Sequence, residues 1–179
     1  MLKRDRCVLV VVDIQGKLAM LMDQRERLFQ NVSKMVRGAK TLGLPIILTE
    51  QYPKGLGPTI PEIRHLLSDV DPVEKICFSC MGSEEFVRRL EALGRDQVLL
   101  VGIETHVCVY QTARDLKERG FQVEIVADAV SSRRAADRDV ALGRMASMGI
   151  PLTTVEMALF ELLGVAGTPE FKKILEIVR

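Results

Sequence analysis

The sequence lacks several features that mark whole classes of protein. It has no tryptophan and only 4% aromatic residues, which argues against a stacking platform for single-stranded nucleic acid. Its formal net charge is +1, so bulk charge does not favour nucleic-acid binding either. Its longest apolar runs, such as residues 7–12, fall far short of the roughly 20 residues that a membrane-spanning helix needs. We therefore expect neither a nucleic acid nor a membrane as a partner.

Cysteine and histidine are also scarce. Four cysteines in 179 residues do not form the dense disulfide framework of small secreted proteins, so we expect reduced thiols and a cytoplasmic location. Basic residues precede the first apolar run, as in a signal peptide, but that run ends at Asp13, which favours a strand. The chain has no second CxxC pair, no paired histidines and no G-x-G-x-x-G motif. We expect no metal and no cofactor.

The composition that remains is typical of a globular enzyme-sized unit. Hydrophobic residues make up 47% of the chain and charged residues 27%, which is enough to build a core and a polar surface. A chain of 179 residues is close to the usual size of one domain, and no linker or low-complexity stretch interrupts it. The sequence therefore predicts a single domain over residues 1–179.

A recurring pattern of helix, glycine and short apolar run predicts the fold. A glycine just past a helix takes the left-handed conformation that ends it, and four glycines occupy such positions: Gly43, Gly94, Gly120 and Gly149. Apolar residues before them have helical spacing, as in Leu28–Leu42. The runs near residues 7–12, 45–49, 73–76, 97–101, 122–127 and 152–155 are almost wholly apolar, as in strands covered on both faces. We expect an α/β fold with three α/β/α layers and a six-stranded, mainly parallel sheet.

Polar side chains follow several of these predicted strands. The first strand ends at Asp13, the third carries Lys75, the fifth ends at Asp128, and Cys108 lies shortly after the fourth. In an open parallel sheet, ligands bind outside the carboxyl ends of the strands. A carboxylate, an ammonium group and a thiol are therefore expected together at one edge of the sheet.

These three groups form a nucleophilic hydrolase site without histidine. A thiol at the start of a helix faces the positive end of the helix dipole, so we expect a lowered pKa for Cys108. Lys75 would hold Asp13 ionised, and Asp13 could move protons. Backbone N–H groups of the turn over residues 102–108 are candidates for an oxyanion hole.

These residues resemble motifs of the isochorismatase-like cysteine hydrolases. The resemblance rests on Val8–Gln15, on Lys75 near Phe78-Ser79, and above all on Gly102–Val109, which reads GIETHVCV. It covers essentially the whole chain in the right order. It implies a Rossmann-like fold with a six-stranded parallel sheet between helices, and assembly into a homo-oligomer.

The same resemblance implies residue roles. The catalytic Asp–Lys–Cys triad of that family corresponds to Asp13, Lys75 and Cys108. The family pattern also implies a cis peptide bond between Ile103 and Glu104, which would aim the backbone N–H of Glu104, with that of Cys108, at an oxyanion.

Two differences between this sequence and other members of that family narrow the expected class of substrate. Nicotinamidases of the family carry an Asp-x-His motif and further histidines that bind a metal, whereas Thr49–Gly55 here contains no histidine. True isochorismatases lack the cysteine that is present here at position 108. The implied reaction is thiol-dependent hydrolysis of a C–N bond in a small amide or carbamoyl compound. The Gln51–Pro58 loop resembles the isochorismatase-domain-containing branch, and we expect Gln51, Tyr52 and Phe78 to contact the small-molecule substrate.

Each candidate residue also has a purely structural interpretation. Cys108 could be a small buried apolar residue, Asp13 a helix N-cap and Lys75 a surface lysine. Cys77-x-x-Cys80 could bind a metal or form a redox pair, but we favour ordinary packing or loop thiols, because a zinc site needs four ligands. If its segment is helical, His106 points away from Cys108, so we do not expect it to activate the thiol.

Two rival functions follow from these interpretations. The chain could be a binding or scaffold protein that keeps the fold without turnover, or a thiol-redox or metal protein that uses its cysteines. The apolar residues of the predicted helices over 156–163 and 169–178 fit either an interface between subunits or a cover for the sheet.

Overall fold

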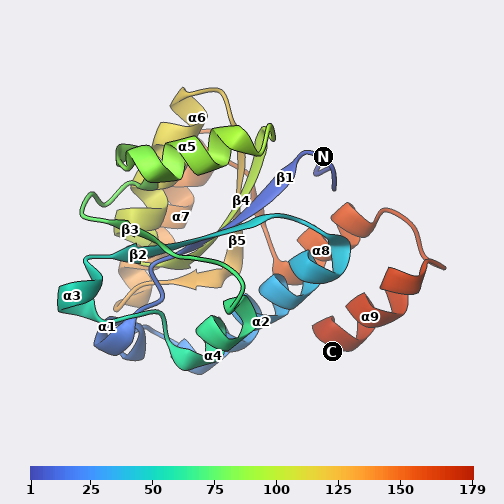
Figure 1. Cartoon of the computed structure of the whole chain (residues 1–179), viewed down its shortest axis with the longest axis horizontal. Coiled ribbons are helices and arrows are strands. Elements are labelled where there is room, and N and C mark those ends of the chain that lie inside the picture. The colour runs from blue at the N-terminus through green and yellow to red at the C-terminus, as the bar shows by residue number, and fades with distance from the viewer.

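A six-stranded parallel sheet lies between two layers of helices in the computed structural model, which describes residues 1–179 (Figure 1). Its strands are β1 (Cys7–Val12), β2 (Ile46–Gln51), β3 (Val73–Lys75), β4 (Gln97–Ile103), β5 (Gln122–Ser131) and β6 (Leu152–Thr153). They lie in the order β3-β2-β1-β4-β5-β6, and every neighbouring pair is parallel. The predicted three-layer α/β/α fold is confirmed.

The two helix layers follow from the alternation of side chains along β1. Every residue of β1 is buried, and successive residues contribute to different hydrophobic cores. One core packs against α1 (Gly16–Met20), α2 (Arg25–Leu42), α4 (Pro61–Arg64), α8 (Val155–Leu163) and α9 (Pro169–Val178). The other packs against α5 (Glu84–Ala92), α6 (Tyr110–Glu118) and α7 (Ala135–Ser147). Both faces of the sheet are thus covered, which explains the continuous apolar runs.

The C-terminal helices α8 and α9 pack against α2. Their buried residues, Val155, Ala158, Leu159, Leu162, Ile174 and Ile177, all belong to the core on that face. The contact with α2 is close, because a Cβ atom added at Gly38 would lie 2.3 Å from Cδ2 of Leu159. Of the two alternatives for these helices, the structure thus shows that much of their apolar surface covers the chain's own core.

Strand β5 differs from the prediction. It runs to Ser131 instead of 127, and its register with β4 slips, so that Leu100 pairs with Ile125 but Gly102 pairs with Val130. Asp128, predicted at the end of this strand, therefore lies in a bulge. Its Oδ1 accepts a hydrogen bond of 2.9 Å from the backbone N–H of Val155, at the start of α8. The bulge re-aims this carboxylate toward a helix terminus.

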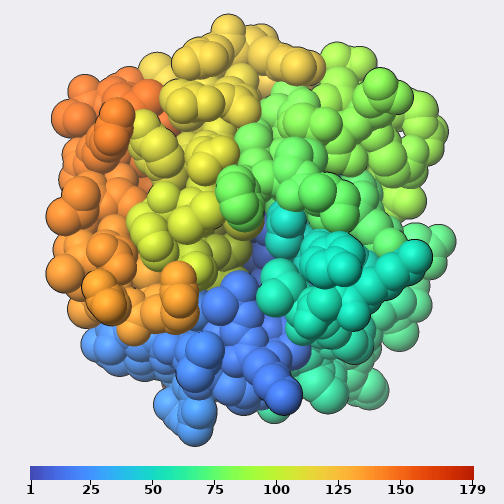
Figure 2. All heavy atoms as spheres, turned by 90° about the vertical axis from the view of Figure 1, so that its left-hand side faces the viewer, coloured from blue at the N-terminus to red at the C-terminus, as the bar shows by residue number.

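The candidate site lies at the carboxyl edge of the sheet. In the strand order, β1 and β4 are neighbours from which the chain winds in opposite directions, which is the usual ligand-binding position of such sheets. Figure 2 shows a hollow at the centre of this face, where the blue, teal, green and yellow-green parts of the chain meet. Separately, no helix of the chain has both the length and the apolar character needed to cross a membrane.

Candidate active site

A buried ion pair joins the ends of β1 and β3. Lys75 Nζ lies 2.6 Å from Asp13 Oδ2, and the two side chains are 0% and 3% exposed respectively. Asp13 has a φ of 52°, a conformation that non-glycine residues rarely adopt, at the point where the chain turns out of the sheet. The structure thus brings together two residues that the sequence places 62 positions apart.

Lys75 is fully engaged by the protein. Its three N–H donors are shared among four acceptors within hydrogen-bond distance of Nζ: Asp13 Oδ2, Gln51 Oε1 at 2.9 Å, and the carbonyl oxygens of Cys77 at 3.2 Å and Phe78 at 3.1 Å. Burial is the largest single influence on the pKa of Lys75 and lowers it. The charge of Asp13, the two nearby thiols and the hydrogen bond to Asp13 together outweigh burial, so the net pKa is raised. Lys75 is therefore a fixed positive charge.

Gln51, expected to contact substrate, has its side chain engaged within the protein. Its Oε1 accepts from Lys75 Nζ, and its Nε2 donates to the carbonyl oxygen of Ile76 at 2.6 Å. The buried Gln15 holds the same loop, since its Nε2 donates to the carbonyl oxygens of Gln51 and Gly57 at 3.1 and 2.7 Å. The loop, which contains the short helix α3 (Pro53–Leu56), is therefore fastened to the end of β1.

Thr49 and Cys80 complete the surroundings of Asp13, and the sequence analysis singled out neither for this site. Thr49 Oγ1 donates to Asp13 Oδ1 at 2.7 Å, so both carboxylate oxygens have a partner. Cys80 Sγ lies 3.9 Å from Thr49 Oγ1, and burial raises the pKa of its thiol to about 11. The alternation of β2 could have identified Thr49, because a polar side chain in a fully covered strand needs a polar partner.

Cys108 lies in a π-helical turn, η3 (Thr105–Val109), directly before α6. Its side chain is buried, with the residue only 7% exposed. Burial raises the pKa of the thiol, the charge of Asp13 raises it further, and Lys75 opposes this only in part. The predicted lowering of this pKa was therefore wrong. Loss of hydration on burial and the neighbouring carboxylate raise this pKa, and the helix dipole is too weak to reverse the rise.

The turn before Cys108 has an unusual backbone. Gly102 has a φ of +119°, and a Cβ atom there would lie 2.1 Å from the carbonyl oxygen of Val12, so only glycine fits. The following Ile103–Glu104 peptide bond is cis. The carbonyl oxygen of Glu104 accepts hydrogen bonds from the N–H groups of Val107 and Val109, which closes the turn.

The remaining predicted residues lie around the edge of the site. Tyr52 and Phe78 are 50% and 54% exposed, and Tyr52 lines a cavity of about 360 Å³ together with Lys75 and Ile76. His106 Nδ1 is 2.9 Å from Ser132 Oγ, so its partner is a hydroxyl group of the loop after β5. No three His, Cys, Asp or Glu side chains are grouped so as to hold a metal ion, and all four cysteines are unpaired.

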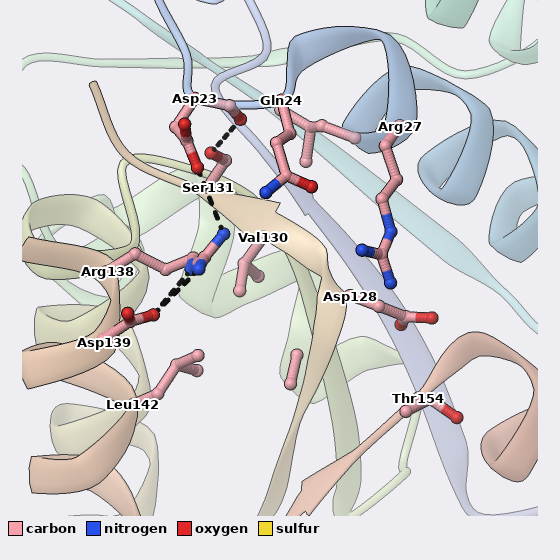
Figure 3. Close-up of a pocket in the computed structure, with 12 residues that line it drawn as sticks. Asp23, Gln24, Arg27, Asp128, Val130, Ser131, Arg138, Asp139, Leu142 and Thr154 are labelled. Carbon is pink, nitrogen blue, oxygen red and sulfur yellow. Dashed lines mark hydrogen bonds and ion pairs between the residues drawn. The ribbon is translucent and has the colours of Figure 1, made fainter. Parts of the chain in front are cut away.

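A second cavity, of about 250 Å³, lies between α2, α7 and β5 (Figure 3). Arg138 enters it from α7 and forms ion pairs with Asp23 at 3.4 Å and Asp139 at 2.9 Å. Asp13, Lys75 and Cys108 do not line it. Its charged groups are largely engaged with one another, so we place the chemistry at the Asp13 site instead.

Comparison with known proteins shows which family the chain belongs to. Residues 7–157 match the isochorismatase domain. The chain belongs to the isochorismatase family. A mouse relative, isochorismatase domain-containing protein 2A, is 41% identical over 175 residues, which cover 96% of this chain and 82% of the mouse protein. The resemblance found in the sequence is thereby confirmed.

Solved structures of two similar proteins share the whole fold. A Caenorhabditis elegans structure described as MAR1 ribonuclease is 37% identical with a TM-score of 0.91, covering 99% of this chain and 91% of that one. The Escherichia coli YcaC gene product, described as an octameric hydrolase of unknown specificity, is 27% identical with a TM-score of 0.92, covering 98% and 89%. Membership of this family supports a hydrolytic role.

Proposed function

We propose that this isochorismatase-family chain is a cysteine hydrolase that cleaves a C–N bond of a small amide or carbamoyl compound. The observation that carries the proposal is that the Asp13 carboxylate is fixed by hydrogen bonds close to the Cys108 thiol. Lys75 and Thr49 hold both oxygens of its carboxylate, and the buried Cys108 thiol faces its negative charge. A thiol that keeps its proton at rest needs a base within reach, and Asp13 supplies one.

The proposed reaction has two halves. Cys108 Sγ forms a bond to the substrate carbonyl carbon while its proton moves to Asp13. The C–N bond then breaks, and the amine or ammonia leaves with that proton. In the second half, water gives a proton to Asp13 and its oxygen attacks the thioester carbon. The C–S bond then breaks, the acid leaves, and the Cys108 sulfur takes the proton back from Asp13.

The other groups of the site act on charge and orientation. Lys75 keeps a positive charge beside Asp13 and opposes the rise in the pKa of the thiol. The backbone N–H groups of Glu104 and Cys108 are the proposed donors to the oxyanion of the tetrahedral intermediate. Tyr52 and Phe78, half-exposed beside the site, are proposed apolar contacts for the substrate.

We also propose a domain organisation, an oligomeric state and a location for the chain. We infer that residues 1–179 act as one domain, because α9, beyond the matched residues, packs into the core. We also infer a homo-oligomer, as in the octameric YcaC relative. The four unpaired cysteines favour a reducing compartment such as the cytoplasm.

Turnover of small amides tests the proposal. Purified protein would be incubated with a panel of primary amides and carbamoyl compounds, and released ammonia would be measured. Cys108→Ala is expected to abolish any release, because it removes the nucleophile. Cys7→Ala is the matched control, because Cys7 lies at the opposite end of β1 from Asp13 and should leave release intact.

The same panel separates the rival functions. An RNA substrate, followed by strand cleavage instead of ammonia, belongs in it, because the C. elegans relative is described as a ribonuclease. Release of ammonia that survives Cys108→Ala would contradict the thiol mechanism. Binding of an amide without any turnover would favour the scaffold alternative.

A further inference from the structure

Glu104 carries a buried carboxylate in the turn that leads to Cys108. Its side chain is only 9% exposed, and its ion-pair partner is Arg133, whose side chain is 56% exposed. Arg133 follows β5, on the far side of the turn from Asp13 in the strand order. Both the backbone N–H and Nε of Arg133 donate to Glu104 Oε1, at 3.2 and 2.9 Å.

This carboxylate creates an electrostatic problem for the proposed reaction. The backbone N–H of Glu104 is one of the two donors assigned to the oxyanion, so the carboxylate belongs to the residue that must stabilise a second negative charge. Two negative charges in a water-poor site repel each other strongly. An arginine is protonated at any pH of interest and can cancel the first charge.

We propose that Arg133 is a positioning residue of the reaction, which neutralises and fixes Glu104 so that the turn can stabilise an oxyanion. This inference rests on the proposed function. Arg133 acts through Glu104 and touches no reacting atom. Its two converging donors also hold the Glu104 side chain in one orientation.

Two reagents that react with Cys108 distinguish a role of Arg133 in oxyanion stabilisation from a general role in supporting the fold. p-Nitrophenyl acetate acetylates a thiol through a tetrahedral intermediate: a bond forms from Sγ to the carbonyl carbon, p-nitrophenolate leaves, and the thiol proton passes to Asp13. Iodoacetamide alkylates the same sulfur at a saturated carbon, displaces iodide and forms no oxyanion. As long as Asp13 is kept, a change in the ratio of the two rates at Cys108 therefore reports the oxyanion-stabilising turn.

Arg133→Met is expected to lower the acetylation rate of Cys108 by about tenfold and to leave alkylation within about twofold. The loss is smaller than the roughly 10²–10³-fold effect of removing an oxyanion-hole donor, because the backbone donor itself remains. Arg133→Lys keeps the positive charge and should retain most of the acetylation rate. Arg134→Met is the matched control. Arg134 is the adjacent exposed residue, and it forms no ion pair, so its loss removes the same charge from the surface without affecting Glu104.

A second substitution makes the test independent of folding. In Arg133→Met, a further Glu104→Gln removes the unbalanced carboxylate, and acetylation should recover by several-fold toward the wild-type rate. A residue that merely supports the fold would give no such recovery. Equal slowing by Arg133→Met and Arg134→Met, or a double variant slower than Arg133→Met, would overturn the inference.

Failure of this inference and failure of the proposed function give different results. If Cys108 is not acetylated at all in the wild type, or is acetylated equally fast in Asp13→Asn, the proposed function fails. If acetylation needs Asp13 but is indifferent to Arg133, only the role of Arg133 is wrong.

Discussion

At the scale of single residues, the ionisation of the Cys108 thiol decides how the site works. Burial and the charge of Asp13 raise its pKa, and Lys75 lowers it. The thiol is thus protonated at neutral pH, and reactivity depends on transferring its proton to Asp13 as the sulfur attacks. Asp13 and Lys75 shift the pKa of Cys108 in opposite directions, and each effect can be tested separately.

The pH dependence of alkylation should shift in opposite directions in two variants. Asp13→Asn removes a negative charge that raises the pKa of Cys108, so the midpoint of the alkylation profile should move to lower pH. Lys75→Met removes the charge that lowers the same pKa, so alkylation should be slower and need higher pH. Rates at Cys108 across pH, followed by peptide mass spectrometry, check both.

Amide hydrolysis should nevertheless be lost in both variants, because Asp13→Asn lacks the base and Lys75→Met lacks its fixed cation. A shift of the two alkylation profiles in the same direction would contradict the assigned electrostatics.

Sequence reasoning located the residues of this site better than it described their environment. Asp13 and Cys108 follow strand ends and Lys75 is the last residue of its strand, and strand ends can be predicted from apolar runs. The direction of the thiol pKa was missed, because the helix dipole is visible in sequence whereas burial and the approach of Asp13 are not. Gln51 was expected at the substrate, and its actual partner, Lys75, is 24 residues away in the chain.

At the scale of elements, helices α2 and α8 can pack closely because position 38 is a glycine, which has no side chain. A Cβ atom at Gly38 would lie 2.3 Å from Leu159, and the neighbouring helix cannot withdraw without opening the core. Gly143, on α7, is a matched helical position, since a Cβ atom there meets nothing within 4 Å.

The same substitution should therefore have opposite effects at the two positions. Gly38→Ala is expected to lower the free energy of unfolding by about 1–3 kcal/mol through overpacking. Gly143→Ala is expected to raise it by about 0.5–1 kcal/mol, because alanine is the better helix former. Urea denaturation of both variants measures the two changes. Equal destabilisation at the two sites would show that Leu159 is free to move.

Elements were predictable where local patterns define them. The apolar spacing of Leu28–Leu42 and the following Gly43 anticipated α2, and β1 lies where its apolar run predicts. The bulge in β5 was not predictable, because the register between Leu100 and Gly102 is set by contacts with β4 and α8 instead of by local sequence.

At the scale of the whole molecule, buried thiols make stability sensitive to alkaline pH. Burial raises the pKa of Cys7 from an ordinary 9.0 to about 12, and that of Cys80 to about 11. Below pH 9 these thiols are protonated in both the folded and the unfolded chain, so their full contribution is present. As pH rises above that value, only the unfolded chain ionises, and stability is lost until the folded thiols ionise too.

The free energy of unfolding should accordingly fall as pH rises from about 9 toward 11, by about 1.4 kcal/mol per pH unit for each such thiol. Cys7→Ala should reduce this slope by the share of one thiol, whatever it does to stability at neutral pH. Urea denaturation at a series of alkaline pH values measures the slope. A slope unchanged by Cys7→Ala would contradict the burial of that thiol.

The central claim is that Cys108 is the nucleophile and that Asp13 takes its proton. Peptide mapping of the acyl-enzyme after brief exposure to p-nitrophenyl acetate tests it most directly, in the wild type and in Asp13→Asn. The account predicts a single acetyl group on Cys108 in the wild type and little or none in the variant. Acetylation spread over Cys77 and other residues, or acetylation of Cys108 that is indifferent to Asp13, would contradict it.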